Sequence, residues 1–184
     1  MYTDKDLTIR PMNENDLHSF WELAFKDEAP EWKKWDAPYY PHKAQTFEEF
    51  SKNAERWLNC DDFWGIEMND KLIGIVSYYW EHEASLWLET GIILYEGENW
   101  GRGIGTRVFR MWFNHLFETL PLVRVGFTTW SGNHRMMRVG EKLGMTMEAR
   151  IRKVRYYDGR YYDSIRMGIL REEWDRMREA STER

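Results

Sequence analysis

The chain has 184 residues, with 26 Lys plus Arg against 31 Asp plus Glu and a formal net charge of -5. A chain of this length can bury one substantial core and is short for two ordinary domains, so we expect a single domain over residues 1–184. The acidic balance argues against nucleic acid or an anionic membrane as a partner, and it suits a cationic amine as a substrate.

Cysteine use and hydropathy favour a cytoplasmic protein. Cys60 is the single cysteine, so no internal disulfide can form, and we expect it to be a structural or incidental thiol. The first ten residues, MYTDKDLTIR, carry acids and no apolar core, unlike a signal peptide. No run approaches the roughly 18 apolar residues of a membrane span. The 11 Trp, 10 Tyr and 9 Phe predict that some rings line a groove; the alternative is that they fill the core and stiffen a homodimer contact.

Periodicity in the first part of the chain predicts a strand, a helix, an irregular loop and a second helix. Apolar and polar residues alternate over 7–12, and Asn13 can cap a helix that continues to Phe25. Residues 27–45 hold three prolines and several aromatic rings without a regular period, as in many functional loops. Thr46 and Glu49 form a capping box for a helix that extends to residue 58.

The rest of the chain reads as strands and helices with clear turn signals. Strands are predicted at 62–68, 71–80, 85–95 and 122–129, and a helix at 104–118 separates the last two. This strand–helix–strand order makes 85–95 and 122–129 parallel neighbours. A helix begins at Asn133 and ends at Gly144, two strands (146–157 and 160–170) flank an Asp-Gly turn, and a charged helix covers 171–180.

The stretch NWGRGIGT places glycines at 101, 103 and 105, directly before the predicted helix. A helix N-terminus offers unpaired N–H groups to an anion, and glycines let the backbone approach it closely. The stretch lacks the lysine of a Walker loop, and Thr106 stands where a dinucleotide fingerprint needs its third glycine. A structural strand-to-helix turn is the alternative.

Three segments resemble the GNAT acetyltransferase superfamily, in particular its RimJ/RimL-like branch of ribosomal-protein N-terminal acetyltransferases. They are WGRGIGT at 100–106, GNHRMMRVGEKLGM at 132–145 and GRYYDSIRMGILREEW at 159–174. Trp100 stands where the family pattern has Gln or Arg, and Gly103 and Gly105 fall on its two small positions. The resemblance implies a mixed α/β (α+β) fold, with a mostly antiparallel sheet, one parallel splayed strand pair and helices on both faces.

The resemblance also implies acetyl-CoA as cosubstrate, no metal, and direct acetyl transfer to an amine. Backbone groups of the glycine turn would bind the pyrophosphate, the strand end would hold the pantetheine and polarise the thioester carbonyl, and an asparagine would bond the pantetheine arm. The cofactor-binding residues so implied are Ile93, Leu94, Tyr95, Trp100, Gly101, Arg102, Gly103, Ile104, Gly105, Thr106 and Asn133.

The attacking amine must be neutral, which bears on the choice of acceptor. An α-amino group with a pKa near 7.8 is roughly 15% neutral at pH 7, whereas a lysine amine near 10.4 is roughly 0.04% neutral. The family often carries a glutamate at the position of Glu89, in LETGI, so Glu89 is the candidate base. A solvent-facing or arginine-paired glutamate is the structural alternative, and Glu81 and Glu83 are weaker candidates.

No residue stands out as the proton donor to the departing thiolate. Relatives commonly carry serine or tyrosine on the helix after the asparagine, where this chain has Met136 and Gly140. Solvent can serve, because a thiol pKa near 8.5 makes the thiolate a tolerable leaving group. Tyr95 and Tyr157 are alternatives by location.

Acids among aromatic rings in the irregular loop suit a cationic acceptor through charge and cation–π contacts. The substrate-binding candidates are Glu28, Trp32, Trp35 and Tyr39, with Glu31 and Asp36 beside them. The leading hypothesis is an N-acetyltransferase that acts on a protein N-terminal α-amino group. A small amine such as a polyamine or aminoglycoside is the alternative acceptor, and a non-catalytic CoA-binding protein is the alternative from another class.

Overall fold

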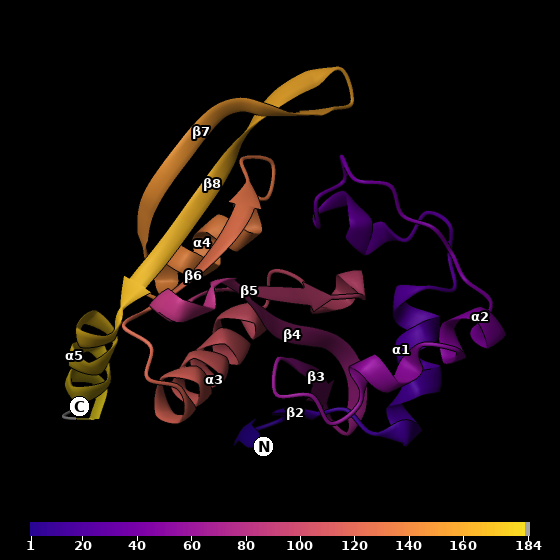
Figure 1. Cartoon of the computed structure of the whole chain (residues 1–184), viewed down its shortest axis with the longest axis horizontal. Helices are drawn as coiled ribbons and strands as arrows, with labels where there is room; N and C mark the ends of the chain where they lie inside the picture. Colours follow the sequence, from indigo (N-terminus) through magenta and orange to yellow (C-terminus); the bar gives the residue numbers. More distant parts are fainter. Residues whose placement is uncertain (183–184) are drawn as a thin grey trace. The chain divides into compact units, whose positions relative to one another are not determined.

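In a computed structural model that describes residues 1–182, the chain forms an eight-stranded sheet and five α-helices (Figure 1). The strands are β1 (Tyr2–Asp4), β2 (Leu7–Pro11), β3 (Phe63–Met68), β4 (Lys71–His82), β5 (Trp87–Leu94), β6 (Arg124–Trp130), β7 (Thr146–Tyr157) and β8 (Arg160–Leu170). The α-helices are α1 (Leu17–Ala24), α2 (Phe47–Ser51), α3 (Ile104–Thr119), α4 (His134–Lys142) and α5 (Arg171–Thr182). Five short 3-10 helices are η1 (Glu14–Asp16), η2 (Glu31–Lys34), η3 (Ala54–Trp57), η4 (Glu83–Ser85) and η5 (Gly97–Asn99).

The strand order is β1-β2-β3-β4-β5-β6-β8-β7. Antiparallel pairing joins β1 to β2, β2 to β3, β3 to β4, β6 to β8 and β7 to β8. The pair β5–β6 is parallel, with Leu88 opposite Val125 and Glu89 opposite Gly126. The strand–helix–strand unit that the sequence predicts is therefore confirmed as β5-α3-β6, and the sheet is mixed and mostly antiparallel.

The chain divides into two compact units. Unit 1 comprises Met1–Ser77 and Ile92–Met111, and unit 2 comprises Tyr78–Gly91 and the chain from Trp112 onward. The core of unit 1 is rich in aromatic rings, and Phe20 packs edge-to-face with Phe50 at a centroid distance of 5.8 Å. Tyr95, which follows β5, belongs to this core, so residues from both segments build it.

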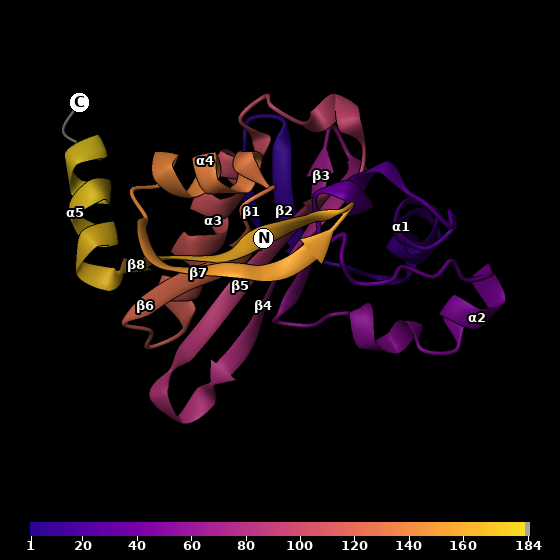
Figure 2. The ribbon, with the colours of Figure 1, turned by 90° about the horizontal axis from the view of Figure 1, so that it is seen from above.

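Unit 2 is organised around the second half of α3 and the strands β6 and β8. Trp174 of α5 is 2% exposed, packs against Phe113 and donates its indole N–H to Asn114. Arg171 donates to the carbonyl oxygen of Phe117 in the last turn of α3, which has no partner in the helix, and to those of Leu120 and Leu122 in the segment that follows. Figure 2 shows β7 and β8 of this unit side by side, as their antiparallel register requires.

The predicted elements are found, with two departures. The N-terminal segment forms the short strand β1, which pairs Tyr2 with Ile9 of β2 and for which the sequence shows no clear alternation. The helix expected over 46–58 divides into α2 and η3 at Asn53, whose φ of -128° and ψ of 19° are not helical. Asparagine competes for backbone hydrogen bonds and so favours helix ends, which accounts for the break.

Candidate active site

The glycine turn in unit 1 is held open by backbone conformation. Gly101 and Gly103 have φ values of 73° and 81°, a region that side chains with a Cβ rarely adopt. A Cβ built at either position would meet nothing within 4 Å, so conformation, not crowding, requires glycine. The turn leads into α3, whose first hydrogen bond runs from the Arg107 N–H to the Gly103 carbonyl at 3.2 Å. The N–H groups that precede Arg107 are those that a helix start offers to an anion.

A buried amide precedes this turn. Asn99 is 1% exposed, and neither its Oδ1 nor its Nδ2 has a hydrogen-bond partner among residues 1–182. Buried polar groups are normally satisfied, so this amide calls for a water or a ligand atom. Together with the open space at Gly101 and Gly103, it fits a phosphate-bearing ligand at the turn.

Trp100 ties the turn to the end of β5. Its indole Nε1 donates to the Leu94 carbonyl oxygen at 2.8 Å. Its ring also meets Trp35 of the irregular loop, at a centroid distance of 6.2 Å and an interplanar angle of 74°. The predicted residues Leu94 and Trp100, from the cofactor group, and Trp35, from the acceptor group, are thus brought together in unit 1.

The irregular loop makes a second aromatic contact with the residue that follows β5. Trp32, 8% exposed, packs edge-to-face on Tyr95 at 5.5 Å and donates its indole N–H to the Leu23 carbonyl. Tyr39 packs on its neighbour Tyr40 at 5.0 Å, and Glu28 is exposed. The rings of Trp32 and Trp35 therefore hold the loop against the strand end and the glycine turn, whereas Glu28 lies on the surface.

A carboxyl and a phenol interact in this part of unit 1. Desolvation raises the pKa of the Asp36 carboxyl, although 48% of its side chain stays exposed and Lys33, at 3.7 Å, acts in the opposite direction. Burial, and then the charge of Asp36, raise the pKa of Tyr95 well above its ordinary value. The phenol of Tyr95 is therefore neutral at physiological pH and keeps its proton.

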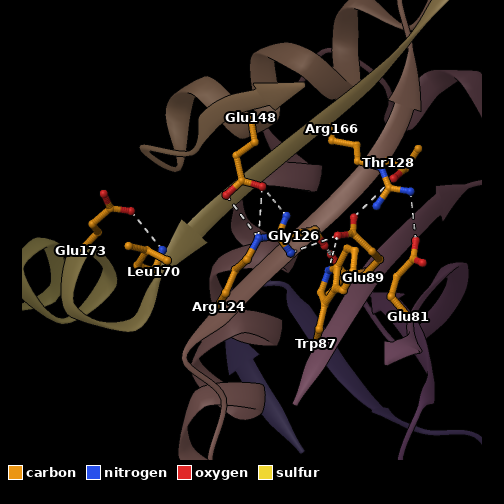
Figure 3. A network of polar contacts seen from close by, with 11 residues as sticks. Glu81, Trp87, Glu89, Arg124, Gly126, Thr128, Glu148, Arg166, Leu170 and Glu173 are labelled. Carbon is orange, nitrogen blue, oxygen red and sulfur yellow. Dashed lines mark hydrogen bonds and ion pairs between the residues drawn. The ribbon is translucent and has the colours of Figure 1, made fainter. Parts of the chain in front are cut away.

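Glu89 of β5 lies in unit 2 as a buried, fully hydrogen-bonded carboxylate (Figure 3). It is 0% exposed. Its Oε1 accepts from Arg124 Nη1 at 3.0 Å and from Trp87 Nε1 at 3.1 Å, and its Oε2 accepts from Thr128 Oγ1 at 3.4 Å. Arg124 compensates the charge that burial would otherwise disfavour. Glu89 is therefore paired with an arginine, as the structural alternative from the sequence described. The catalytic role of Glu89 stays a prediction.

Arg124 joins Glu89 to a second carboxylate. Its Nε donates to both oxygens of Glu148, at 3.2 Å and 3.1 Å, and Figure 3 shows its guanidinium lying between Glu148 and Glu89. Burial alone would lower the pKa of Arg124, but the two carboxylates outweigh it and raise the pKa. Arg124 is therefore a fixed cation shared by a buried carboxylate and a partly exposed one.

Two glycines on neighbouring strands make room for this ion pair. A Cβ at Gly126 would lie 2.4 Å from Arg124 Nη2, and one at Gly168 would lie 2.4 Å from Glu148 Oε1. Gly126 of β6 and Gly168 of β8 are opposite each other in the antiparallel register. The side chains of Arg124 and Glu148 therefore occupy the space that side chains at positions 126 and 168 would otherwise fill.

Tyr79 of β4 faces the same group of residues. Its side chain is 52% exposed, and burial of the phenol, followed by the charges of Glu89 and Glu81, raises its pKa. Arg166 and a hydrogen bond with the Thr128 side chain act in the opposite direction. The tyrosine therefore keeps its proton at neutral pH.

Asn133 caps α4 in unit 2. Its Oδ1 accepts from the Met136 N–H at 3.1 Å, as an N-cap side chain does. The sequence predicts that Asn133 also bonds the pantetheine arm, and that role stays a prediction. Gly140 of α4 cannot carry a side chain without displacement, because a Cβ there would lie 2.8 Å from Met167 Cε and Sδ and 3.0 Å from Phe127 Cζ. Packing thus accounts for the absence of a hydroxyl at this position.

The remaining candidates have structural partners. Tyr157 packs edge-to-face on Trp130 at 6.1 Å, Glu81 pairs with Arg166 at 3.3 Å, and Glu83 of η4 is exposed beside the hydrogen bond of His82 Nδ1 with Ser85 Oγ. Within residues 1–182, no cluster of His, Cys, Asp and Glu side chains could hold a metal ion. In the same part of the chain, no helix combines the length and the apolar character that a membrane crossing requires.

Sequence comparison assigns the family. The family described as "Acetyltransferase (GNAT) domain" matches residues 6–146, more than half of the chain. The chain therefore belongs to the GNAT acetyltransferases, and it is an N-acetyltransferase of a family that uses acetyl-CoA. The GNAT resemblance, the enzyme class and the fold class are confirmed; the RimJ/RimL-like substrate branch stays a prediction.

Individual relatives agree with this assignment. The chain is 26% identical over 176 residues to YokL, an SPbeta prophage-derived uncharacterized N-acetyltransferase of Bacillus subtilis (strain 168), and the match covers 95% of each. Its fold is similar to that of spermidine N-acetyltransferase from Vibrio cholerae in complex with CoA and spermine, with a TM-score of 0.75 and 20% identity. The match covers 93% of this chain and 99% of the Vibrio chain. A GNAT-family acetyltransferase from Bacillus anthracis gives a TM-score of 0.73 at 19% identity, and the match covers 91% of this chain and 96% of the Bacillus chain.

Several residues of the site were outside the reach of sequence reasoning. Arg124, Thr128 and Trp87, the partners of Glu89, come from two strands, and their pairing depends on the register of β5 with β6. The paired glycines at 126 and 168 are the signal that could have indicated them, because glycine inside a strand often marks a close approach of other atoms.

Proposed function

We propose that the protein transfers the acetyl group of acetyl-CoA to the α-amino group of a protein N-terminus. The observation that carries this proposal is the commitment of Glu89 to three donors, Arg124, Trp87 and Thr128. These donors occupy both oxygens of the carboxylate, so an acceptor amine that is already partly neutral suits this site best. An α-amino group is about 15% neutral at pH 7, whereas a lysine-type amine, at roughly 0.04% neutral, depends far more on a base.

The chain's own groups divide the work of binding and orientation. The N–H groups from Gly101 to Thr106 would hold the pyrophosphate, with the exposed Arg102 beside them. Backbone groups of Ile93, Leu94 and Tyr95 would hold the pantetheine and polarise the thioester carbonyl, and Asn133 would bond the pantetheine arm. Trp100 fixes the turn on the strand end through its bond to Leu94.

Bound acetyl-CoA supplies the thioester whose carbonyl carbon the amine attacks. A C–N bond forms, the C–S bond breaks, and the amine proton passes to Glu89 directly or through a water. The thiolate takes a proton from solvent, because burial and the charge of Asp36 raise the pKa of the Tyr95 phenol well above its ordinary value and so make Tyr95 a poor proton donor. A thiolate with a pKa near 8.5 leaves without strong acid assistance.

A small polycationic amine is the second candidate acceptor. Asp36 carries a carboxyl among the rings of the irregular loop. A second carboxylate of this loop, Glu31, lies beside Gly97, where a Cβ would be 3.2 Å from its Oε2. Acids and aromatic rings together attract cations. A structural relative of similar fold is a spermidine N-acetyltransferase in complex with spermine, which motivates including polyamines in the test.

Two measurements test the proposal. Isothermal titration with acetyl-CoA should show binding by the wild type and its loss in Gly103→Arg, whose side chain would fill the turn. Release of the CoA thiol should then be fastest with lysine-free peptides that have a free α-amino group, and slower with spermine, an aminoglycoside or N-acetylated lysine peptides. Faster turnover of spermine would show that a small polycationic amine, and not a protein N-terminus, is the preferred acceptor. Binding without turnover of any amine in the panel would overturn both candidate acceptors.

A further inference from the structure

We propose that the hairpin formed by β7 and β8 makes the protein selective for N-termini that are followed by acidic residues. The inference deepens the proposed function and rests on it, because it takes a polypeptide with a free α-amino group as the acceptor and places the amine beside Glu89 on β5. It does not depend on which group takes the proton of the amine. We use the name basic hairpin for residues 150–162, which carry the selectivity.

Positive charge is concentrated in the basic hairpin. Residues 150–160 contain five basic residues and one acid, Asp158, whereas the whole chain has a net charge of -5. The basic residues are Arg150, Arg152, Lys153, Arg155 and Arg160. A local cluster of charge attracts ligands of the opposite sign and helps to select them over others. The basic hairpin is therefore suited to an anionic partner.

Three cations of the basic hairpin have no carboxylate partner in the described part of the protein. Nearer the candidate active site, Arg166 pairs with Glu81 at 3.3 Å (Figure 3). The side chains of Arg152, Lys153 and Arg160 are exposed, and within residues 1–182 none of them makes an ion pair. Their charges are therefore available to a ligand, unlike that of Arg166.

A β-bulge at the edge of the sheet presents two of these cations. β7 is the last strand of the sheet, and its register with β8 shifts after Ile151, so that residues 152–154 lie opposite Asp163. Asp163 fixes the bulge, because its Oδ1 accepts from the Lys153 N–H at 2.9 Å and its Oδ2 accepts from Arg150 Nε at 2.6 Å. Bulges re-aim side chains, and they keep an edge strand from pairing with another copy. The bulge therefore favours a ligand of the side chains over a second copy of this chain.

The far end of the basic hairpin lies on the same face of the sheet as Glu89. Thr128 of β6 donates to Glu89 and is directly opposite Arg166 of β8. Residues opposite each other on neighbouring strands share a face, and so do alternate residues along one strand. Every second residue of β8 from Arg166 to Arg160 is therefore on the face of Glu89.

Aromatic rings continue this row between its two ends. Trp130 of β6 packs edge-to-face on Tyr162 at 4.7 Å and on Tyr157 at 6.1 Å. Tyr157 is in turn directly opposite Arg160. Strands rise about 3.3 Å per residue, so the distance along β8 from Arg166 to Arg160 is roughly 20 Å. An extended acceptor with its amine beside the candidate base would therefore bring about its fifth to seventh residues to Tyr162 and Arg160.

Carboxylates are the anions that a polypeptide can offer at this distance. Arginine binds a carboxylate through two parallel N–H···O bonds, which suits the side chains of Asp and Glu. Each exposed ion pair contributes only about two- to threefold, so three of them together amount to about tenfold. A nucleic acid is the less suitable occupant, because the net charge of -5 repels a polyanion. The favoured ligand is therefore an acidic segment that follows the N-terminus of the acceptor.

Three lysine-free peptides with a free α-amino group test the selectivity of the full-length protein. The first has Asp at its fifth, sixth and seventh residues, the second has Asn at these positions, and the third has the three Asp ten residues further along. The first should have a kcat/KM about tenfold above that of the second, and the third should match the second. The preference should fall as the salt concentration rises, because exposed charges are screened. Fluorescence anisotropy of the labelled peptides, measured with CoA present, should give the same order of affinities.

A triple variant removes the unpaired cations of the basic hairpin. It combines Arg152→Gln, Lys153→Gln and Arg160→Gln. These changes keep polar side chains at exposed positions, so the melting temperature should stay close to that of the wild type. The ratio of the kcat/KM values for the Asp and Asn peptides should fall from about ten to about one.

A second triple variant controls for the change in net charge. It combines Lys5→Gln, Lys52→Gln and Arg176→Gln, at exposed residues outside the basic hairpin. The change in net charge is the same in the two triple variants. The control should keep the preference for the Asp peptide, so a loss in the first triple variant alone assigns the preference to the hairpin.

The outcomes separate this inference from the proposed function. Equal kcat/KM values of the wild type for the Asp and Asn peptides, or a preference that both triple variants keep, overturn the selectivity while acetyl transfer to peptides stands. A single-stranded oligonucleotide that binds the wild type more tightly than the Asp peptide, or a dimer that dissociates in the first triple variant, overturns it by assigning the hairpin to another partner. Absence of transfer to every peptide overturns the proposed function itself, and the selectivity with it.

Discussion

The guanidinium of Arg124 lies where a side chain at Gly126, two residues along the same strand, would have to be. The distance from a Cβ at position 126 to Arg124 Nη2 would be 2.4 Å, and to Nη1 2.6 Å. Nη1 is also the atom that donates to Glu89 at 3.0 Å. The absence of a side chain at Gly126 is therefore a condition for the ion pair that compensates a buried carboxylate.

Gly126→Ala should break this ion pair without unfolding the protein, because the guanidinium is the free end of a flexible side chain and can move. The expected result is a fall of about tenfold or more in kcat/KM for the amine, since Glu89, the proposed acceptor of its proton, loses its counter-ion. The matched control is Gly168→Ala, which displaces Glu148 but leaves the bond between Arg124 and Glu89 in place. Equal kcat/KM values for wild type and Gly126→Ala would contradict a role for the pair in catalysis.

Trp100→Phe should weaken acetyl-CoA binding. The change keeps an aromatic ring but removes the N–H that donates to the Leu94 carbonyl at 2.8 Å, so the glycine turn is no longer tied to β5. We expect the Kd measured by titration to rise about tenfold, corresponding to roughly 1.4 kcal/mol. Trp21→Phe is the control, because it removes a bond of the same kind and length to the Gln45 carbonyl elsewhere in unit 1. A Kd that changes equally in both variants would show a general loss of stability instead.

Asn133 can be tested for its two roles separately. Asn133→Ala removes the cap on the Met136 N–H and should lower the stability of the protein by about 1 kcal/mol. Asn133→Ser keeps a good cap but is too short to reach a ligand in the same way, so the melting temperature should stay close to that of the wild type. If Asn133 bonds the pantetheine arm, the KM for acetyl-CoA rises in both variants. A wild-type KM in Asn133→Ser would leave Asn133 as a helix cap alone.

Acid should weaken the fold through Asp16. Burial acts to raise the pKa of Asp16, but the hydrogen bonds from Arg10, at 2.8 Å to each oxygen, and from the Asn13 N–H outweigh it and lower the pKa below 3.8. A lowered folded-state pKa stabilises the protein above the unfolded-state value, and this contribution is lost as the pH falls through the folded-state value.

The measurement is the free energy of unfolding in urea as a function of pH. Asp16→Asn should lower it by about 1–3 kcal/mol at pH 7, because Arg10 loses one of its two charged partners in a part-buried site and keeps Glu67. The difference from wild type should shrink below pH 3.8 and approach zero when Asp16 is protonated. The exposed Asp175→Asn should follow the wild-type curve throughout, and a difference for Asp16→Asn that is independent of pH would contradict the assignment.

Local signals made most of the fold predictable. The Asp-Gly turn between β7 and β8 and the glycine turn before α3 depend on a few neighbouring residues, and both are found. The cofactor-binding residues followed from the family resemblance and the aromatic loop from its own composition, and the structure brings Trp35 to Trp100 and Trp32 to Tyr95.

The surroundings of Glu89 could not be predicted, because they depend on long-range register. Arg124 is 35 residues away in the chain and Thr128 is 39 away, and they reach Glu89 because β6 lies parallel to β5 in one register. A slip of one residue would turn Arg124 and Thr128 to the other face of the sheet. The single domain, the homodimer and the cytoplasmic location stay predictions.

Unit 1 is built from two separate segments of the chain, Met1–Ser77 and Ile92–Met111. This separation affects how the protein is made. A ribosome that has made the first 77 residues has not yet made Tyr95, a member of the first core. Nascent chains of that length must therefore leave rings such as Phe20 and Trp32 without part of their packing until about residue 111 has left the exit tunnel. During this interval, chaperones and proteases meet the aromatic residues that the finished enzyme conceals.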